Sequence, residues 1–478
     1  MSTGRFQRAT GLLVLGATGT AAALLWFAVA AGDHEGTSTP QWGTVFGSWQ
    51  VFYDTQSPQP QAILVAAALA MLSAASVALL ERRVSTRSRR SVDRHSSPLA
   101  PRVVMAATKD VFAGPVTVTV LIPAHNEEGS IAATIASLLS QSHQPERVIV
   151  VADNCTDATV SIARRSGVEV FESVGNTHKK AGALNQALKR ILPQQGENDV
   201  VMVMDADTVL DQGFLSSAVT RFTSDRALMA IGGLFYGEPG HGILGQFQRN
   251  EYIRYAREMR RRRGRVFVLT GTASIFRPRA LRTVAESRSH SIPGAPGDVY
   301  DTAALTEDNE LTIALKSLGA LMVSPAECTV VTELMPTWST LGAQRLRWQR
   351  GALENLGAYG LTPQTFRYWA QQLGIGYGVI ALSTYLVLIL LTVLSLDQWI
   401  WFPFWAAIGV LFVVERVVTV WNGGPRARLL ALTLFPELIF DMYLNVVFVK
   451  GILDMALGQQ ADWKHVTRPA TPLDLQAA

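Results

Sequence analysis

Carboxylates and lysines in the middle of the chain lie where they could bind a diphosphate. Asp205 and Asp207 come directly after the apolar run 199–204. Two carboxylates so close together offer the oxygen ligands that Mg²⁺ or Mn²⁺ prefers. Lys179 and Lys180 precede the pattern of a helix, whose N-terminus favours an anion. The alternatives are two solvated acids in a loop and two surface lysines.

Two further segments near the end of this region carry reactive side chains. Thr306-Glu-Asp308 opens an amphipathic helix over 309–318, where Thr306 could equally be an N-cap with acids in the first turn. In a later basic helix, Arg347 could hold a phosphate bidentately and Trp348 could stack on a sugar. The alternative for this helix is a headgroup-binding face with one buried Trp.

The elements that position these residues alternate between strand and helix patterns. Strands are predicted at 116–122, 147–152, 168–171 and 199–204, and helices at 129–140 and from Lys179 onward. Apolar strands that alternate with helices indicate a mainly parallel α/β sheet covered on both faces. Ligands bind at the carboxyl ends of such strands. Asp153, Lys180 and Asp205 all lie at or just beyond strand ends.

Several function classes find no support in the sequence. It has no Gly-x-x-x-x-Gly-Lys-Ser/Thr phosphate loop. The run Asp205-Ala-Asp-Thr-Val209 fits the opening of haloacid-dehalogenase phosphatases, but three strands precede it and those enzymes usually carry it on the first strand. Cys155 and Cys328 have no metal-ligand spacing, so we interpret both as packing residues.

Apolar residues divide the chain of 478 residues into three regions. Only 17% of the residues are charged, against about 25% in a typical soluble domain. Because about 20 residues cross a bilayer core, four uncharged runs are candidate spans: 11–31, 62–80, 373–396 and 399–414, the last extended to 421. The first run could pass for a secretory signal, but it is longer than the roughly 7–15 apolar residues of such signals.

Positive charge sets the predicted orientation of these spans. Residues 82–94 contain six arginines, whereas residues 32–61 contain no Lys or Arg. We therefore expect the Arg-rich side and the middle region to be cytoplasmic. Next to a span, these arginines favour anionic membrane lipids over nucleic acid as a partner.

The predicted organisation follows from these patterns. Residues 1–82 form an N-terminal membrane region with two transmembrane helices, and residues 83–114 form a basic linker that lies as a tether or along the membrane. Residues 115–351 form the α/β domain. Residues 352–478 form a second membrane region with two or more transmembrane helices and an interfacial helix over 429–457, whose Glu437, Asp441 and Asn445 share one face.

Taken in order, the motifs of the middle region resemble the inverting family 2 glycosyltransferases. The resemblance is to the membrane-embedded, processive β-glycan synthases that make cellulose, hyaluronan, chitin oligosaccharides and poly-N-acetylglucosamine. It covers about residues 115–351 and implies a GT-A fold. The residues that carry it are Asp153, Lys180-Ala-Gly, Asp205-Ala-Asp207, Thr306-Glu-Asp308 and Gln344-x-x-Arg-Trp348.

The resemblance also implies a reaction and a set of roles. A nucleotide sugar, most often a UDP-sugar, would donate its sugar to a growing β-linked glycan at the cytoplasmic face of the cell membrane, coupled to export, with Asp308 as the general base. The other roles that the resemblance implies are nucleotide-sugar binding by Ala124, Glu127, Asp153, Lys180, Asp205 and Arg347, acceptor binding by Gly271, Glu307, Gln344 and Trp348, and Mg²⁺ or Mn²⁺ binding by Asp205 and Asp207.

Some residues depart from the family pattern and leave alternatives open. Ala152 stands where many members have a second acid, and Thr270-Gly271 replaces the Cys-Gly or Ser-Gly pair of many polymer-forming members. Transfer of one sugar to a membrane lipid is therefore the second hypothesis, and a silent scaffold or channel that binds nucleotide is the third. The arginine-rich stretch 257–265 is interpreted as a headgroup-facing strip, or as a site for an acidic sugar or lipid phosphate. The sequence leaves room for an oligomer.

Overall fold

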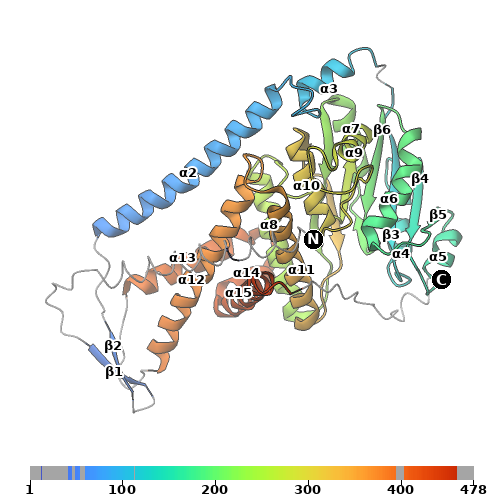
Figure 1. Ribbon diagram of the computed structural model, residues 1–478. Helices are drawn as coiled ribbons and strands as arrows, with labels where there is room; N and C mark the ends of the chain where they lie inside the picture. Colours follow the sequence, from blue (N-terminus) through green and yellow to red (C-terminus); the bar gives the residue numbers. More distant parts are fainter. Residues whose placement is uncertain are drawn as a thin grey trace. The chain divides into compact units, whose positions relative to one another are not determined.

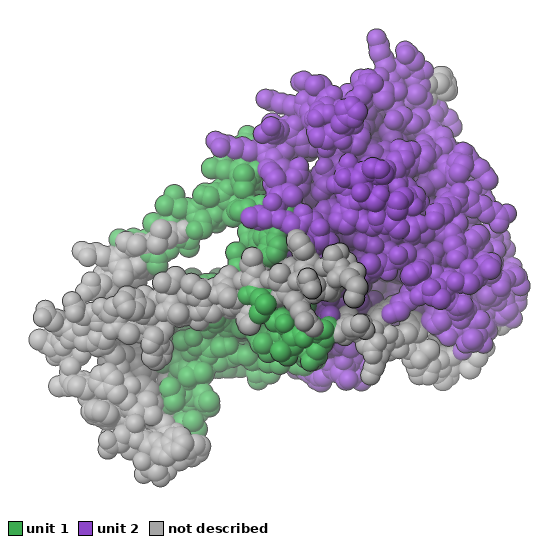
Figure 2. Space-filling model, in the orientation of Figure 1, with its two compact units in different colours: residues 1–82, 365–460 green, residues 83–364, 461–478 purple. Residues whose placement is uncertain are grey.

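The computed structural model describes residues 12, 41–45, 49–53, 60–111, 114–394 and 403–459. The chain divides into two units, coloured separately in Figure 2. The helical unit comprises residues 1–82 and 365–460, and the sheet unit comprises residues 83–364 and 461–478.

A seven-stranded sheet forms the centre of the sheet unit (Figure 1). Its strand order is β11-β8-β10-β6-β3-β4-β5. The neighbours β6, β3, β4 and β5 are parallel, whereas β10 runs antiparallel to both β6 and β8. The strands are β3 (Thr117–Ala124), β4 (Arg147–Ala152), β5 (Glu169–Glu172), β6 (Asp199–Met204), β8 (Leu228–Gly232), β10 (Ala273–Phe276) and β11 (Leu321–Val323).

A second, smaller sheet and nine α-helices complete the described part of the sheet unit. The small sheet has the order β7-β12-β9, with β7 (Thr208–Leu210), β9 (Leu234–Gly237) and β12 (Thr329–Thr332). The helices are α3 (Pro101–Ala107), α4 (Ile131–Leu139), α5 (Thr159–Arg165), α6 (Lys179–Ile191), α7 (Phe214–Ser224), α8 (Gly242–Arg261), α9 (Pro278–Ser287), α10 (Glu307–Ser317) and α11 (Trp338–Tyr359).

Alternating side chains on the strands give the large sheet two buried faces. Along β3, Val118, Val120 and Ile122 belong to a cluster completed by α4 and α7, while Leu121 belongs to a cluster completed by α6, α9 and α10. Successive side chains on a strand point to opposite faces. Helices thus cover both faces, which confirms the mainly parallel α/β sheet predicted from the sequence; the antiparallel β10 was not predicted.

The predicted linker is partly wrong. Leu99, Val103 and Val104 are buried, and the Leu99 N–H donates to the Leu318 carbonyl at 3.0 Å, so this segment packs onto the sheet unit rather than serving as a tether. Pro101 occupies the first position of α3. A proline is tolerated there because that N–H has no partner within the helix.

The helical unit contains the predicted membrane segments that the structure describes. Its elements are β1 (Gln41–Val45), β2 (Trp49–Tyr53), the first part of α2 (Pro60–Arg90), α12 (Phe366–Leu394), α13 (Pro403–Thr419), α14 (Gly424–Thr433) and α15 (Phe435–Ala456). Among the described residues, one helix, 366–391 within α12, is by itself long and apolar enough to cross a bilayer. The stretches 405–419 and 421–433 meet the same criterion only together, as a pair bent by 56°. Nearly all of the first predicted span, 11–31, lies outside the described residues.

The predicted interfacial helix over 429–457 is wrong as a single element. The chain breaks at Leu434, which has a φ of 53°, and Pro436 follows within the first turn of α15. Glu437 and Asp441 share a face of α15 as predicted, but that face is paired with Arg416 of α13. The stripe therefore neutralises an arginine within the helical unit.

Candidate active site

The carboxyl ends of the parallel strands and the start of β10 meet at one edge of the sheet. Asp153 follows β4 and Asp205 follows β6. Because β10 is antiparallel, its first residue, Ala273, pairs with Met204 at the end of β6. The Asp205 N–H donates to the Thr272 carbonyl at 3.3 Å. The antiparallel strand thus brings the loop before it to the edge where ligands bind.

Lys180 is the centre of a charged cluster at this edge. Its Nζ lies 2.6 Å from Asp205 Oδ1 and 2.9 Å from Glu307 Oε1. Burial acts to lower the pKa of Lys180, but the two carboxylates outweigh it and hold the pKa well above its usual range. Its neighbour Lys179 has a φ of 54°, a backbone conformation that residues other than glycine seldom adopt. Lys180 is therefore a fixed positive charge in the first turn of α6.

Gly271 fills the narrow space beside this cluster. A Cβ atom at this position would lie 3.0 Å from Lys180 Nζ and 3.2 Å from Asp205 Oδ2. The Gly271 N–H donates to Asp308 Oδ2 at 3.0 Å. A residue without a side chain lets the backbone pass between the lysine and the predicted base.

Asp308 is held by backbone donors in the first turn of α10. Its Oδ1 accepts from the Asn309 N–H at 2.7 Å, in addition to the bond from Gly271. Burial and the charge of Glu307 raise the pKa of Asp308 to about 6, against the opposing charge of Lys180. A carboxyl group with this pKa is ionised at neutral pH and can still accept a proton.

Thr306 is the N-cap residue of α10, and acids occupy the first turn of that helix, as the structural alternative expected. The Thr306 side chain forms no capping hydrogen bond to α10. Its Oγ1 and its carbonyl oxygen each accept from Asn355 Nδ2 of α11, at 3.2 Å. A Cβ atom at Gly351 would lie 2.5 Å from Thr306 Oγ1, so α11 crosses closely over the start of α10.

Asp153 lies in a separate hydrogen-bonded group at the end of β4. Its Oδ1 accepts from Ser173 Oγ at 2.6 Å, from Asn176 Nδ2 at 2.8 Å and from Asn154 Nδ2 at 3.0 Å. Its N–H donates to the carbonyl of Ala124 at 2.9 Å. These bonds fix the carboxylate that the family resemblance assigns to the nucleotide.

Negative charge accumulates around Asp207. Burial, followed by the charges of Asp205, Glu127 and Glu333, raises the pKa of Asp207 to about 8. Burial likewise raises the pKa of Glu127 to about 7. Glu333, which follows β12, was not predicted as a site residue because it lies in no recognised motif. A cation would relieve this repulsion.

The carboxylates of Asp205 and Asp207 fit a divalent cation that is held partly by the diphosphate of a substrate. Among the described residues, no group of three or more His, Cys, Asp or Glu side chains is placed so that it could hold a metal ion by itself. Mg²⁺ usually binds through one or two carboxylates together with water and substrate phosphates. Asp205 and Asp207 can supply such a pair of oxygen ligands.

In α11, Arg345 organises the Gln-x-x-Arg-Trp motif. Its guanidinium lies 4.2 Å from the centre of the Trp348 ring and donates to Gln344 Oε1 at 2.7 Å and Glu251 Oε2 at 2.8 Å. Sequence reasoning selected Arg347 and passed over Arg345. The charge of Arg347 does reach Glu307, whose pKa it helps to lower.

The structure joins some predicted site residues and keeps others apart. Lys180, Asp205, Gly271 and Asp308 form one connected cluster with Glu307. The contacts described for Asp153, and those for Gln344 and Trp348, belong to their own groups. At the end of α8, Arg260 donates to the Tyr236 hydroxyl at 3.0 Å and Arg262 pairs with Glu258, so part of the arginine-rich stretch is held within the fold.

Comparison with known families decides the class of this domain. Residues 119–285 match the family model described as glycosyl transferase family 2. The chain carries a family 2 glycosyltransferase domain. This match confirms the family predicted from the motifs, and the GT-A architecture agrees with it. The matched range contains Asp153, Lys180, Asp205 and Gly271, and it ends before Asp308.

The curated relatives that match this domain are synthases of a bacterial polysaccharide. The chain is 26% identical over 246 residues to the poly-β-1,6-N-acetyl-D-glucosamine synthase of Staphylococcus aureus (strain MSSA476), which covers 50% of this chain and 55% of that protein. The enzyme of the same description from Staphylococcus epidermidis is 24% identical over 245 residues, with the same coverage. The chain thus spans about half the length of the curated relatives it matches.

Two solved structures are similar to this chain. A mannosyltransferase from Pyrobaculum calidifontis in complex with GDP-Man and Mn²⁺ is 17% identical, with a TM-score of 0.47 and coverage of 83% of this chain and 99% of that one. The glucosyl-3-phosphoglycerate synthase from Mycobacterium tuberculosis, in complex with Mn²⁺, UDP and phosphoglyceric acid, is 20% identical, with a TM-score of 0.35 and coverage of 57% and 86%.

Proposed function

We propose that this chain is an inverting synthase that transfers sugar from a UDP-sugar to a growing β-linked glycan at the cytoplasmic face of the cell membrane and passes the product outward. The observation that carries the proposal is the connected cluster in which Asp308, held by backbone donors, lies next to the Lys180–Asp205 pair. The similarity to poly-N-acetylglucosamine synthases supports a glycan product. The arginine-rich residues 82–94 and the apolar helix α12 support a membrane location.

The cluster supplies the groups that a single displacement needs. Asp308 takes the proton of the acceptor hydroxyl as that oxygen forms a bond to the anomeric carbon. The bond from this carbon to the diphosphate breaks at the same time, and its electron pair leaves with the nucleoside diphosphate. Lys180, together with Arg347, binds the diphosphate and stabilises its charge. An α-linked donor therefore gives a β-linked product, and one carboxylate base is sufficient.

Asp205 and Asp207 are the residues that would hold Mg²⁺ or Mn²⁺ in this reaction. When bound, the divalent cation neutralises charge on the departing diphosphate. Glu127 and Ala124, near Asp153, would complete the nucleotide side, while Gln344 and Trp348 on α11 would bind the acceptor.

We expect purified full-length enzyme in nanodiscs to release UDP from one member of a UDP-sugar panel when Mg²⁺ or Mn²⁺ is present. Because at most two protein carboxylates would hold the cation, EDTA should remove it and lower the rate by at least roughly a hundredfold, with recovery when the cation is returned. UDP release and product size are the measurements. A rate that EDTA leaves unchanged would rule out the cation.

The size of the product separates the two transfer hypotheses. A ladder of glycans supports the synthase, whereas lipids that carry a single sugar would overturn it in favour of the second hypothesis. One observation favours the transfer of a single sugar to a lipid. In the described part of the chain, only one helix is by itself long and apolar enough to cross a bilayer. Tight binding of UDP without any UDP release across the panel would point to the catalytically silent scaffold.

The pH dependence of the rate should follow the ionisation of Asp308. Burial and the charge of Glu307 on the same helix raise the pKa of Asp308, Lys180 on α6 lowers it, and the result is about 6. The base acts only when deprotonated, so kcat/KM should be level at pH 7–8 and fall about tenfold per pH unit below about 6. Initial rates between pH 5 and 8 test this, with folding at pH 5 checked by circular dichroism. A level profile down to pH 5 would contradict it.

A further inference from the structure

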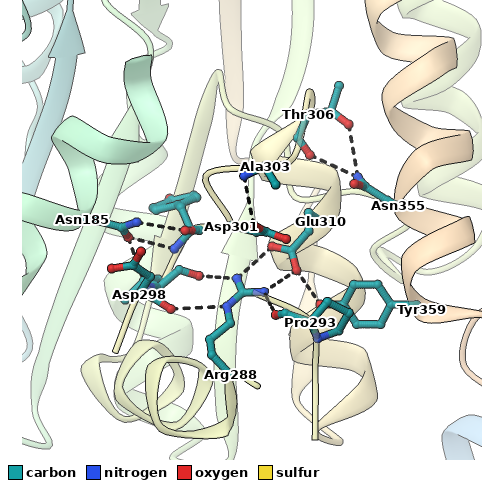
Figure 3. Close-up of polar contacts among 12 residues, drawn as sticks. Asn185, Arg288, Pro293, Asp298, Asp301, Ala303, Thr306, Glu310, Asn355 and Tyr359 are labelled. Atoms are coloured by element: carbon teal, nitrogen blue, oxygen red, sulfur yellow. Dashed lines mark hydrogen bonds and ion pairs between the residues drawn. The ribbon is translucent and has the colours of Figure 1, made fainter. Parts of the chain in front are cut away.

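A segment between α9 and α10, residues 288–306, is wrapped around the side chain of Arg288 (Figure 3). This guanidinium is fully buried. It donates to both oxygens of Glu310 on α10, at 2.5 and 2.8 Å. It also donates to the carbonyls of Pro293 at 2.7 Å and Val299 at 2.5 Å. The segment is thereby fixed to the helix that carries Asp308.

The far side of the same segment is fixed to α6, the helix that carries Lys180. Asn185 Oδ1 accepts from the N–H groups of Val299 and Tyr300, at 3.1 and 2.9 Å. Its Nδ2 donates to the Tyr300 carbonyl at 2.9 Å. Figure 3 shows Asn185 and Arg288 on either side of this part of the segment. Asn185 therefore holds the backbone of Tyr300, while Arg288 holds the carbonyl of the preceding residue, Val299.

Tyr300 lines a small pocket beside the charged cluster. It is only 3% exposed and shares this pocket with Lys180, Gly271, Glu307 and Asp308. Within the part of the chain that the structure describes, its hydroxyl forms no hydrogen bond. Burial raises the pKa of Tyr300, so the hydroxyl keeps its proton at neutral pH and can act as a donor.

A tyrosine hydroxyl that has no partner among the described residues is free to form a hydrogen bond with a ligand in the pocket. The pocket is at the end of the site that holds Asp308, where the sugar would react, and Asp153 is not among its lining residues. We propose that Tyr300 is a donor-binding residue whose hydroxyl forms a hydrogen bond with the transferred sugar rather than with the nucleotide. This inference rests on the proposed function, because it requires a nucleotide-sugar donor.

We expect the Tyr300→Phe variant to bind the sugar part of the donor less well. Loss of one neutral hydrogen bond corresponds to about a three- to tenfold weaker affinity. The variant is made in an Asp308→Asn background, so that bound donor is not consumed. Isothermal titration compares UDP with the UDP-sugar of the panel that binds this background most tightly. Tyr300→Phe should weaken UDP-sugar binding and leave UDP binding unchanged.

The matched control is Tyr359→Phe, which removes a hydroxyl that donates to Glu310 outside the pocket. It should lower thermal stability without changing the affinity ratio of UDP-sugar to UDP. Equal weakening of both ligands by Tyr300→Phe, or no weakening, would overturn the inference. Because the titrations need no turnover, a wild-type enzyme that transfers no sugar would reject the proposed function and still leave this ratio measurable.

Discussion

We expect the Asp308→Asn variant to lose sugar transfer by roughly 10²–10⁴-fold, the usual contribution of a general base. The amide has nearly the same shape as the carboxylate, but it cannot take the proton of the acceptor hydroxyl. Only one of its two polar atoms can accept the hydrogen bonds that Gly271 and Asn309 now donate to the two carboxylate oxygens. The initial rate of UDP release measures the loss, and isothermal titration with UDP should show that nucleotide binding is retained.

A matched substitution tests whether this effect is specific. Glu327 is an exposed carboxylate that pairs with Arg221 at 3.0 Å. Exposed ion pairs contribute little to stability, so Glu327→Gln should keep the wild-type rate. If Asp308→Asn also keeps that rate, another group is the base and the mechanism is wrong.

Asp153 and Asp205 could be located from the sequence because local rules position them. The strands before them are short, apolar and rich in β-branched residues, and the predicted ranges 147–152 and 199–204 match β4 and β6. The carboxyl ends of parallel strands then lie at the same edge of the sheet. Lys180 follows the same logic, since the helix pattern that begins at Lys179 matches the start of α6.

Glu333, Arg345 and Tyr300 could not be found in this way. Glu333 and Tyr300 lie near the charged cluster only because of residues far away along the chain, and neither belongs to a periodic pattern or a recognised motif. Arg345 stands at one of the unspecified positions of the Gln-x-x-Arg-Trp motif. The antiparallel strand β10, which brings Gly271 to Asp308, also follows no local rule, since an isolated short apolar run gives no direction.

We expect the Arg288→Met variant to destabilise the sheet unit by about 3–5 kcal/mol, because removing one partner of a buried ion pair leaves an uncompensated charge. Here that charge is Glu310, which is 1% exposed. The carbonyls of Pro293 and Val299 would lose their donors as well. Thermal unfolding of the full chain in nanodiscs, followed by intrinsic fluorescence, should show a drop of roughly 10 °C in the apparent Tm.

Two controls separate the buried pair from a general effect of the substitution. Arg147→Met breaks a pair of the same type with Glu169, but on the surface, where the expected change is about 0–1 kcal/mol. In the double variant Arg288→Met with Glu310→Met, no buried charge is left alone, so part of the lost stability should return. If Arg288→Met is as stable as Arg147→Met, the Arg288–Glu310 pair does not hold the segment 288–306.

If the pair does hold this segment, Arg288→Met should also weaken UDP-sugar binding relative to UDP binding, because Tyr300 would no longer be fixed in the pocket.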